Sequence, residues 1–207
     1  NKKITNCISE LLDFCKNPEI VVISSGAARI FDKNGLNKNQ LTNTPYEYLK
    51  FYEEEILSSK SNSLVLRIFA LSGRFIKDPN LFAIGNFLLN AKSNESIKIE
   101  SKNNVIRSYG FASDIANCAI SWLSDKNKTN FLNLKIDAAT HTLNLIDLAN
   151  SITTQYSLPK VNENVDFRLE ENNYSCDPNA YLNLLKHYNI KATSLSSQLE
   201  ETMKDIT

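Results

Sequence analysis

Glycine is scarce in this sequence. The 207 residues contain five: Gly26, Gly35, Gly73, Gly85 and Gly110. Their spacing matches neither Gly-x-Gly-x-x-Gly nor Gly-x-x-Gly-x-x-Gly, the turns in which a strand-to-helix backbone approaches a dinucleotide pyrophosphate. The sequence therefore provides no glycine-rich phosphate-binding turn of its own.

Cysteine and histidine are also few. The four cysteines, Cys7, Cys15, Cys118 and Cys176, are scattered without metal-type spacing, and the two histidines have no partner at ligand spacing. We therefore expect no metal site, and we expect reduced, mostly buried thiols of a cytoplasmic protein. No apolar run approaches the roughly 20 residues of a membrane helix, and no signal peptide is recognisable, so no membrane partner is expected.

Charge of one sign is not in excess. The 23 basic and 23 acidic side chains give a formal net charge of zero, and no run of Lys or Arg forms a patch. We therefore expect no nucleic-acid partner. With 42% hydrophobic residues the chain is long enough to bury a sizeable core in one domain, or in a domain plus a lobe.

The first third of the chain has the pattern of an α/β fold. Ile8, Leu11, Leu12 and Cys15 lie at helical spacing and predict a helix over residues 4–15 that ends before Pro18. The β-branched run at 20–23 is typical of a strand covered on both faces. A second apolar run at 64–69 follows the next predicted helix, so the order strand, helix, strand predicts a right-handed parallel crossover.

The remainder predicts a smaller mixed lobe. Helices are expected at 81–91, 113–123 (capped by Ser113 or Asp114), 143–156, 179–188 and 194–203, and strands at 96–100, 131–134 and 165–169. We expect residues 1–75 to form the parallel-sheet part and residues 76–207 to form the lobe, with interleaved returns to the sheet.

Three polar residues lie where the predicted sheet meets the helix after Pro45. Tyr46 and Lys50 are four residues apart, so they project from one face of that helix, and a serine that ends the first strand can reach them. A phenol near pKa 10 needs about 4 kcal/mol of stabilisation to titrate about 3 units lower, and a nearby ammonium supplies much of it. The arrangement predicts a proton-transfer site.

Tyr-x-x-x-Lys is a weak pattern by itself. Tyr156 and Lys160 also match it, but Pro159 lies between them and a helix does not run through it. An amphipathic surface helix is the alternative interpretation of the Tyr46 segment. The polar loop at 26–44 is longer than a plain connection needs, which favours a binding loop.

Several short segments occur together in an order that resembles the extended short-chain dehydrogenase/reductase family. They are Ser24-Ser25-Gly26-Ala27, Tyr46-x-x-x-Lys50 with Glu54, Leu66-Arg67-Ile68-Phe69, Leu81 to Phe87, Arg107-Ser108-Tyr109 and Ala112-Ser113-Asp114. Over about residues 21–202 the chain is similar to the NAD-dependent nucleotide-sugar epimerases and dehydratases of that family. The resemblance implies the C-terminal part of a Rossmann-like parallel sheet with a small mixed α/β substrate-binding lobe.

The resemblance also implies catalytic roles. Tyr46 would be the acid/base, and Lys50 would lower its pKa and hold the nicotinamide ribose of NAD or NADP. Ser25 would orient the substrate hydroxyl or keto group, and Ser24 is the competing candidate for a serine beside the cofactor. Arg67, inside a buried strand, is interpreted as a structural charge that is paired internally.

Two further residues would bind a nucleotide-diphosphate sugar. Asn86 stands where the family contacts the nucleotide sugar, and Arg107 stands where it grips the diphosphate, whose oxygens suit a guanidinium fork. Structural alternatives remain open: Asn86 could cap or bridge within its helix, and Arg107 could pair with Asp114 or Glu100. The family also implies a homodimer in which the helices that contain Leu11-Leu12 and Phe51 to Ile56 pack into a four-helix bundle.

The sequence departs from the family in two ways. The glycine-rich turn is missing and the chain opens at Asn1, so we expect the C-terminal part of a longer protein, with roughly a hundred residues absent, a typical share of a domain. Such a fragment should not hold NAD tightly and should be inactive alone. Arg29 stands where the family usually has an aromatic residue that lines the sugar pocket.

The residues after Ser25 indicate which of the family's reactions this sequence favours. Dehydratases and decarboxylases of the family tend to place an acid there, because elimination needs an extra acid and base, whereas here Gly26, Ala27 and Ala28 follow. This favours an epimerase or ketoreductase over a 4,6-dehydratase or decarboxylase. A non-catalytic nucleotide-binding relative and an unrelated α/β domain remain alternatives.

Overall fold

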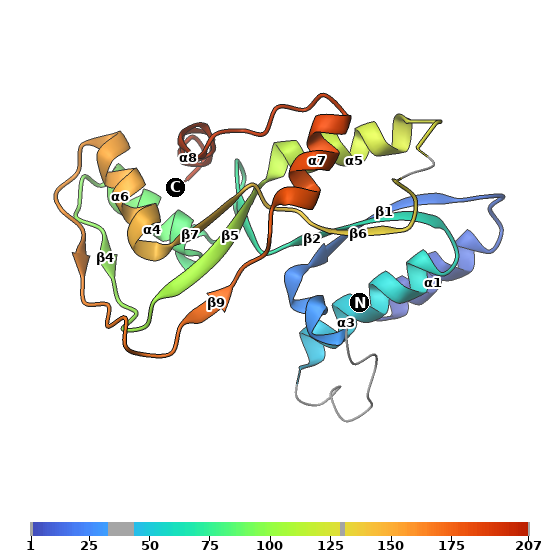
Figure 1. Cartoon of the computed structure of the whole chain (residues 1–207), viewed down its shortest axis with the longest axis horizontal. Helices are drawn as coiled ribbons and strands as arrows, with labels where there is room; N and C mark the ends of the chain where they lie inside the picture. Colours follow the sequence, from blue (N-terminus) through green and yellow to red (C-terminus); the bar gives the residue numbers. More distant parts are fainter. Residues whose placement is uncertain (1, 33–43, 129–130, 207) are drawn as a thin grey trace.

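The computed structural model describes residues 2–32, 44–128 and 131–206 (Figure 1). Its helices are α1 Lys2–Leu12, α3 Pro45–Ser58, α4 Ala83–Lys92, α5 Ala112–Ser124, α6 Leu145–Tyr156, α7 Asn179–His187 and α8 Leu195–Met203, with 3-10 helices η1 Gly26–Phe31 and η2 Pro79–Leu81. Its strands are β1 Glu19–Ser25, β2 Asn62–Ile68, β3 Ala70–Ser72, β4 Lys98–Ile99, β5 Val105–Phe111, β6 Leu134–Asp137, β7 His141–Asn144, β8 Asn162–Glu163 and β9 Asn172–Tyr174.

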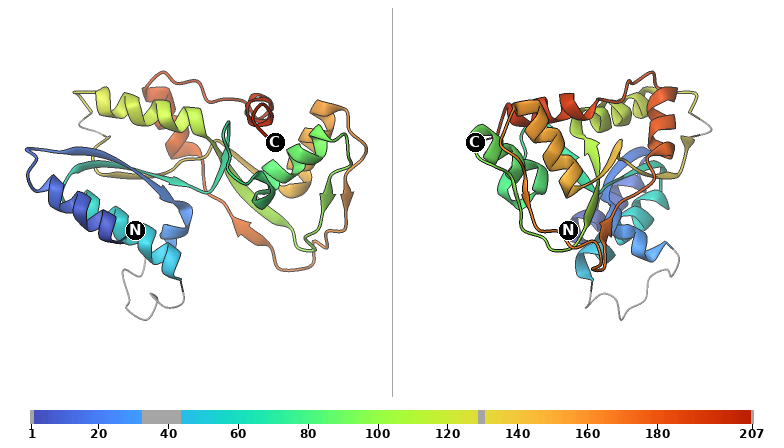
Figure 2. Two further views of the ribbon diagram at one scale, coloured as in Figure 1. Left: turned by 180° about the vertical axis from the view of Figure 1, so that it is seen from behind. Right: turned by 60° about the vertical axis from the view of Figure 1, so that its left-hand side comes forward.

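The first sheet is parallel and has the order β1-β2-β6. Helices α1 and α3 cover one face, and α5 and α7 cover the other, as the view from behind in Figure 2 also shows. Leu64, Leu66 and Trp122 belong to the core on the α5 side, whereas Val65 and Leu57 pack together on the α3 side. Strands β1 and β2, which precede and follow α3 in the chain, pair in parallel. The predicted parallel pairing of the first two strands is therefore confirmed.

The second sheet forms the lobe and is mixed. Strand β5 pairs parallel with β3 and β9 and antiparallel with β7, and β4 pairs with β8 in a small separate sheet. Helices α4, α6 and α8 enclose a second core that includes Leu88, Leu148, Ile152 and Leu199. The lobe is not a separate stretch of chain, because β6 returns to the first sheet before β7 rejoins the second.

Several lobe strands differ from the prediction. Residues 165–169 are not a strand; the strands lie on either side, at β8 and β9. The strand expected at 131–134 begins only at Leu134, and β5 and β7 lack the apolar alternation that would have predicted them. The caps predicted for α5 are wrong as well. Asp114 instead accepts hydrogen bonds from the backbone N–H and hydroxyl of Thr193, at 2.9 and 2.8 Å, and so holds the segment before α8.

The apolar side chains of α1 and β1 are only partly covered. Helix α1 buries Thr5 and Ser9, while Leu11 is 62% exposed. Ile23 of β1 is 47% exposed, so the prediction of a strand covered on both faces is wrong at this residue. The prediction of mostly buried cysteines is also wrong: Cys7 and Cys15 are exposed, Cys176 is half-buried and only Cys118 is fully buried.

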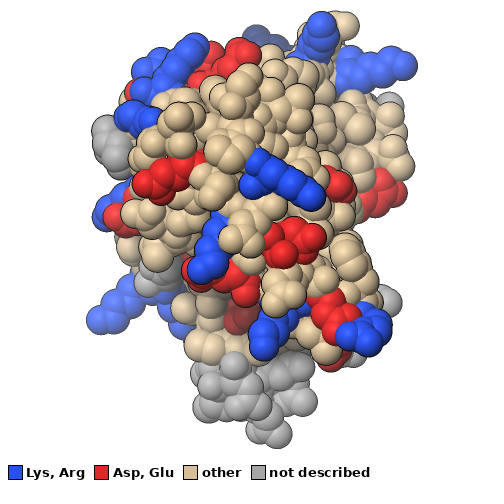
Figure 3. Space-filling model, turned by 90° about the vertical axis from the view of Figure 1, so that its left-hand side faces the viewer, with Lys and Arg blue, Asp and Glu red and all other residues tan. Residues whose placement is uncertain are grey.

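Charged side chains of both signs share the surface. On the face shown in Figure 3, Lys and Arg alternate with Asp and Glu without a large area of one sign. Across the described ranges, none of the helices has the length and apolar character needed to cross a membrane.

Candidate active site

A row of polar residues crosses the carboxyl end of the first sheet. Ser24 of β1 is in register with Arg67 of β2, which is in register with Asp137 of β6. Ser25, the last residue of β1, turns the chain into η1, and its Oγ accepts a hydrogen bond from the Ala27 N–H at 3.3 Å. Gly26 is required at this turn, since a Cβ there would lie 2.5 Å from the Phe69 ring. The crevice at the strand ends is where open α/β sheets bind ligands.

Arg67, in the middle of this row, is the centre of a buried network of hydrogen bonds and ion pairs. It is 3% exposed and donates from Nε and NH2 to Glu54 (2.9 and 2.6 Å) and from NH1 and NH2 to Asp32 (2.6 and 2.7 Å). Ser24 donates to Glu54 at 2.6 Å. The predicted internal pairing of Arg67 is therefore confirmed, and Ser24 is committed to the network. The network joins η1, α3 and both strands.

Tyr46 and Lys50 lie in the first turns of α3, which begins at Pro45, a residue suited to the first helical position. Tyr46 is 53% exposed, and the Lys50 ammonium forms an ion pair with Glu53 at 2.9 Å. Tyr46 also lies close enough to Tyr174 to contribute to the pKa of that residue. The binding loop predicted at 26–44 begins with η1, and its part at 33–43 lies outside the described residues.

Tyr174 is a site residue that the sequence did not predict. Its hydroxyl lies 3.2 Å from Ser25 Oγ, and its ring packs on Phe69 with centroids 4.7 Å apart. Burial raises the pKa of the Tyr174 phenol, although the hydrogen bond with Ser25 acts in the opposite direction. Tyr174 and Ser25 are 149 residues apart in the chain, and Tyr174 lies in a strand whose pattern gave no signal.

Arg107 reaches the same region from β5, where it is in register with Tyr174 of β9. Its NH1 donates to the carbonyl oxygens of Ile106 and Asn172, at 2.7 and 2.9 Å. In the described part of the chain no carboxylate pairs with it, so the predicted alternatives with Asp114 and Glu100 are wrong. Arg107 therefore keeps a charge that no described acid neutralises.

Arg107 lines a cavity of about 380 Å³. Aromatic side chains form much of the wall: Phe69, Phe82, Tyr109 and Tyr174. The Tyr109 hydroxyl is buried without a hydrogen-bond partner among the described residues, and burial raises its pKa, so it stays a neutral donor. A cation beside aromatic faces and phenols suits a ligand that combines anionic groups with rings.

Asn86 lies in α4 and lines an adjoining cavity of about 610 Å³. The two cavities share Leu81, Phe82, Ala83 and Leu145, so Asn86 and Arg107 face neighbouring spaces and not a single one. The backbone N–H of Asn86 donates to the Phe82 carbonyl at 2.9 Å, which is part of the helix start. Its side chain is thus available to the cavity.

Arg29 lies on the other side of Tyr174. It pairs with Asp137 at 3.5 Å, donates to the Ser175 carbonyl at 3.2 Å and lies 5.7 Å from the Phe69 ring centroid. Burial raises the pKa of Asp137, and the charge of Arg29 opposes that rise. Arg29 lines a cavity of about 330 Å³ together with Gly26, Glu47 and Tyr174. Within the described residues no group of three or more His, Cys, Asp or Glu side chains could hold a metal ion.

No family model and no curated protein matches the sequence, but solved structures do. UDP-glucuronic acid 4-epimerase from Bacillus cereus, solved with UDP-glucuronic acid and NAD, is 16% identical with a TM-score of 0.72, covering 99% of this chain and 66% of that one. UDP-glucose 4-epimerase from Thermotoga maritima, solved with UDP-glucose, is 16% identical with a TM-score of 0.69, covering 97% and 67%.

A third similar structure is that of an enzyme that catalyses a different reaction. The dTDP-glucose 4,6-dehydratase of Bacillus anthracis, solved with NAD, is 13% identical with a TM-score of 0.69, covering 97% of this chain and 65% of that one. The chain thus spans about two thirds of the length of each of these enzymes. The expected fold is confirmed: this chain has the α/β fold of the C-terminal portion of the Rossmann-like nucleotide-sugar epimerases and dehydratases.

Proposed function

We propose that this chain is the substrate-binding and proton-transfer part of an NAD-dependent enzyme that acts on nucleotide-diphosphate sugars, as an epimerase or a ketoreductase. One observation carries the proposal. Ser25, at the carboxyl end of β1, contacts Tyr174 at 3.2 Å, and Tyr174 in turn lines the aromatic cavity of Arg107. A group that can hold a sugar oxygen and a cation that can hold phosphates thus lie on either side of one tyrosine.

The chain's own residues supply the proton chemistry. Ser25 holds the sugar oxygen, and the geometry supports it over Ser24, whose hydroxyl is committed to Glu54. Tyr46 moves the proton, and Lys50 follows one helical turn on in α3, where its ammonium pairs with Glu53. When bound, the nicotinamide supplies the hydride chemistry. Tyr46 and Lys50 would hold its ribose end, whereas the sequence contains no glycine-rich motif for its pyrophosphate.

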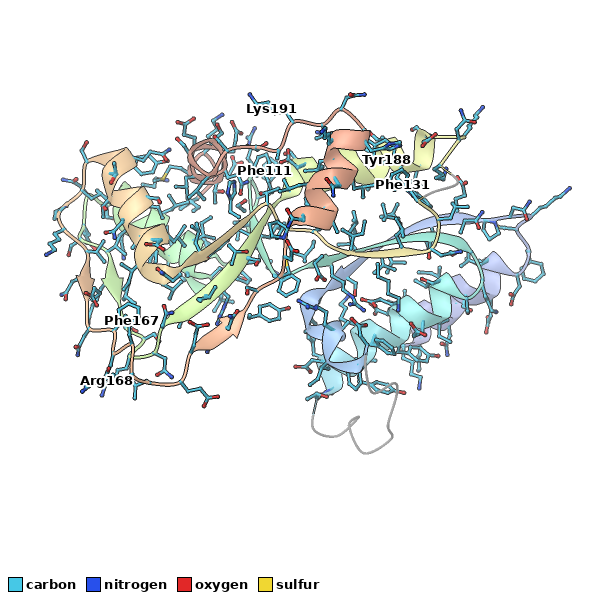
Figure 4. The ribbon with its side chains drawn as sticks, viewed as in Figure 1. Phe111, Phe131, Phe167, Arg168, Tyr188 and Lys191 are labelled. Carbon is cyan, nitrogen blue, oxygen red and sulfur yellow. The ribbon has the colours of Figure 1, made fainter. Side chains whose placement is uncertain are left out.

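Substrate binding is the first test. Isothermal titration calorimetry of UDP and dTDP with the 207-residue chain should give saturable binding. Arg107→Gln should weaken it at least about tenfold, because a hydrogen bond to a charged group contributes about 1.5–3 kcal/mol. Arg168→Gln is the matched control. Arg168 already pairs with Asp166 and lies at the far end of the lobe in Figure 4. Equal affinity in the wild type and the Arg107 variant would refute the assignment of Arg107.

A specific observation keeps dehydration as a second candidate. No acid follows Ser25 in the sequence, but Glu47, next to Tyr46 in α3, lines the same cavity as Gly26 and Tyr174. Turnover of UDP-glucose and dTDP-glucose with NAD, followed by NMR, separates the two. The assay should use the 207-residue chain and, where the gene encodes residues before Asn1, the longer protein as well. Tyr46→Phe should abolish either reaction, whereas Glu47→Gln should abolish only a dehydration.

The exposed face of α1 supports a homodimer. Ile4, Ile8 and Leu11 lie on this helix with large exposed areas, whereas Phe51 of α3 is buried against Phe31 and so is not part of such a face. Light scattering should therefore give twice the monomer mass. Leu11→Glu should return the monomer, since it places a charge in the contact, and a monomeric wild type would contradict the proposal.

A further inference from the structure

We propose that Tyr174 is a substrate-positioning residue that sets the direction of the Ser25 hydroxyl. The inference rests on the proposed function and deepens it, because it adds a residue to the group that holds the reacting sugar oxygen. The observation behind it is the contact of 3.2 Å between the Tyr174 hydroxyl and Ser25 Oγ.

The hydrogen-bonding capacity of Ser25 explains why this contact matters. A serine hydroxyl has one donor and two acceptor lone pairs. The Ala27 N–H uses one lone pair of Ser25 at the start of η1. If Tyr174 donates to the second lone pair, the Ser25 proton is left to donate to an incoming oxygen. If Ser25 donates to Tyr174 instead, its second lone pair is left to accept from an incoming hydroxyl.

The single proton of the substrate alcohol decides which arrangement suits the proposed reaction. The alcohol donates that proton to Tyr46, so its oxygen can only accept from Ser25. The ketone formed by oxidation also only accepts, so Ser25 has to donate to the substrate oxygen in both states. Tyr174 therefore acts as the donor to Ser25, which leaves the Ser25 proton for the substrate.

The phenol is held in place for this role. Tyr174 is in register with Arg107 across the pairing of β9 with β5, and its ring packs on Phe69. Phe69 and Tyr174 also line both the cavity of Arg107 and the cavity of Arg29, so the pair forms the wall between them. Burial raises the pKa of the Tyr174 phenol, which keeps its proton available at neutral pH.

Calorimetry can isolate this effect from general binding. The ligands are the nucleoside diphosphate that binds more tightly, UDP or dTDP, and its glucose conjugate. Tyr174→Phe keeps the ring on Phe69 and removes only the hydroxyl. It should weaken binding of the conjugate about fivefold, the size of one neutral hydrogen bond, and weaken binding of the diphosphate clearly less. Ser25→Ala should likewise weaken mainly the conjugate.

The double variant shows whether Tyr174 acts through Ser25. In a Ser25→Ala background, Tyr174→Phe should have no further effect, because the hydroxyl that it directs is gone. Tyr181→Phe is the matched control, since it removes a buried phenol oxygen far from the site, in the core beside α5. Additive losses, an equal loss for the diphosphate, or no loss in either single variant would overturn the inference. A wild type that binds neither ligand would instead refute the proposed function, on which the inference rests.

Discussion

The buried network around Arg67 should be the most sensitive part of the first sheet to substitution. Arg67 is 3% exposed, and Glu54, which accepts two of its hydrogen bonds, has no exposed surface. In Arg67→Ala, Glu54 keeps only the Ser24 hydroxyl at 2.6 Å and the Lys135 ammonium at 3.7 Å. Asp32, by contrast, has a side chain that is 39% exposed and can be hydrated again. The cost therefore comes mainly from Glu54.

The expected magnitude follows from that geometry. Removing one partner of a buried ion pair costs about 3–5 kcal/mol, because the other charge stays in a medium that solvates it poorly. In a protein of this size each kcal/mol lowers the melting temperature by about 2–4 °C, so Arg67→Ala should melt roughly 6–20 °C below the wild type. Urea unfolding followed by circular dichroism measures the free energy, and a thermal scan measures the melting temperature.

Two further variants make this prediction refutable. Arg74 contacts Asp205 through Nε and NH2, as Arg67 contacts Glu54, but the Arg74 side chain is 48% exposed. Arg74→Ala should therefore leave the melting temperature unchanged, because solvent already screens the pair. Replacing both Arg67 and Glu54 by apolar residues should recover much of the loss. Equal melting temperatures for the two arginine variants would show that the buried charge is not what stabilises this region.

Three other properties can be predicted from the same structure. Burial opposes ionisation of Asp32, but the hydrogen bonds and charge of Arg67 outweigh it and lower its pKa. The ionised Asp32 carboxylate therefore stabilises the fold fully above its unfolded pKa of about 3.9, and this stabilisation is lost as the pH falls through its folded pKa. Asp32→Asn should lower the free energy of unfolding at pH 7 and should make that free energy less dependent on pH in acid. Burial raises the pKa of Asp137, so the folded state favours its protonated form. Asp137→Asn should therefore increase the free energy of unfolding at pH 7, and a decrease would contradict this reasoning. Burial also raises the pKa of Cys118 to about 12, so iodoacetamide at pH 8 should modify exposed Cys7 in the folded protein and Cys118 only after unfolding, as mass spectrometry would show.

Local pattern was enough to predict much of the fold. The β-branched run that became β1, the Pro45 helix start of α3 and the apolar run that became β2 each carry a strong short-range signal, and their order predicted the parallel pairing. All five lobe helices were also predicted within two residues at both ends, because their apolar faces recur at helical spacing. The ion pairing of Arg67 could also be predicted, because a single charged residue in a buried strand needs a partner of opposite charge.

What the sequence could not determine was which residues meet across long distances in the chain. Strand β9 is short, exposed along much of its length and polar, so no local preference predicts it; it exists because the edge of β5 pairs with it. That pairing alone brings Tyr174 to Ser25 and aligns it with Arg107. The exposure of α1 and β1 also depends on what lies against them, which no periodicity records. The sequence determined the elements and the chemistry that they carry, whereas the partner of the Ser25 hydroxyl was decided by a strand pairing that only the tertiary structure creates.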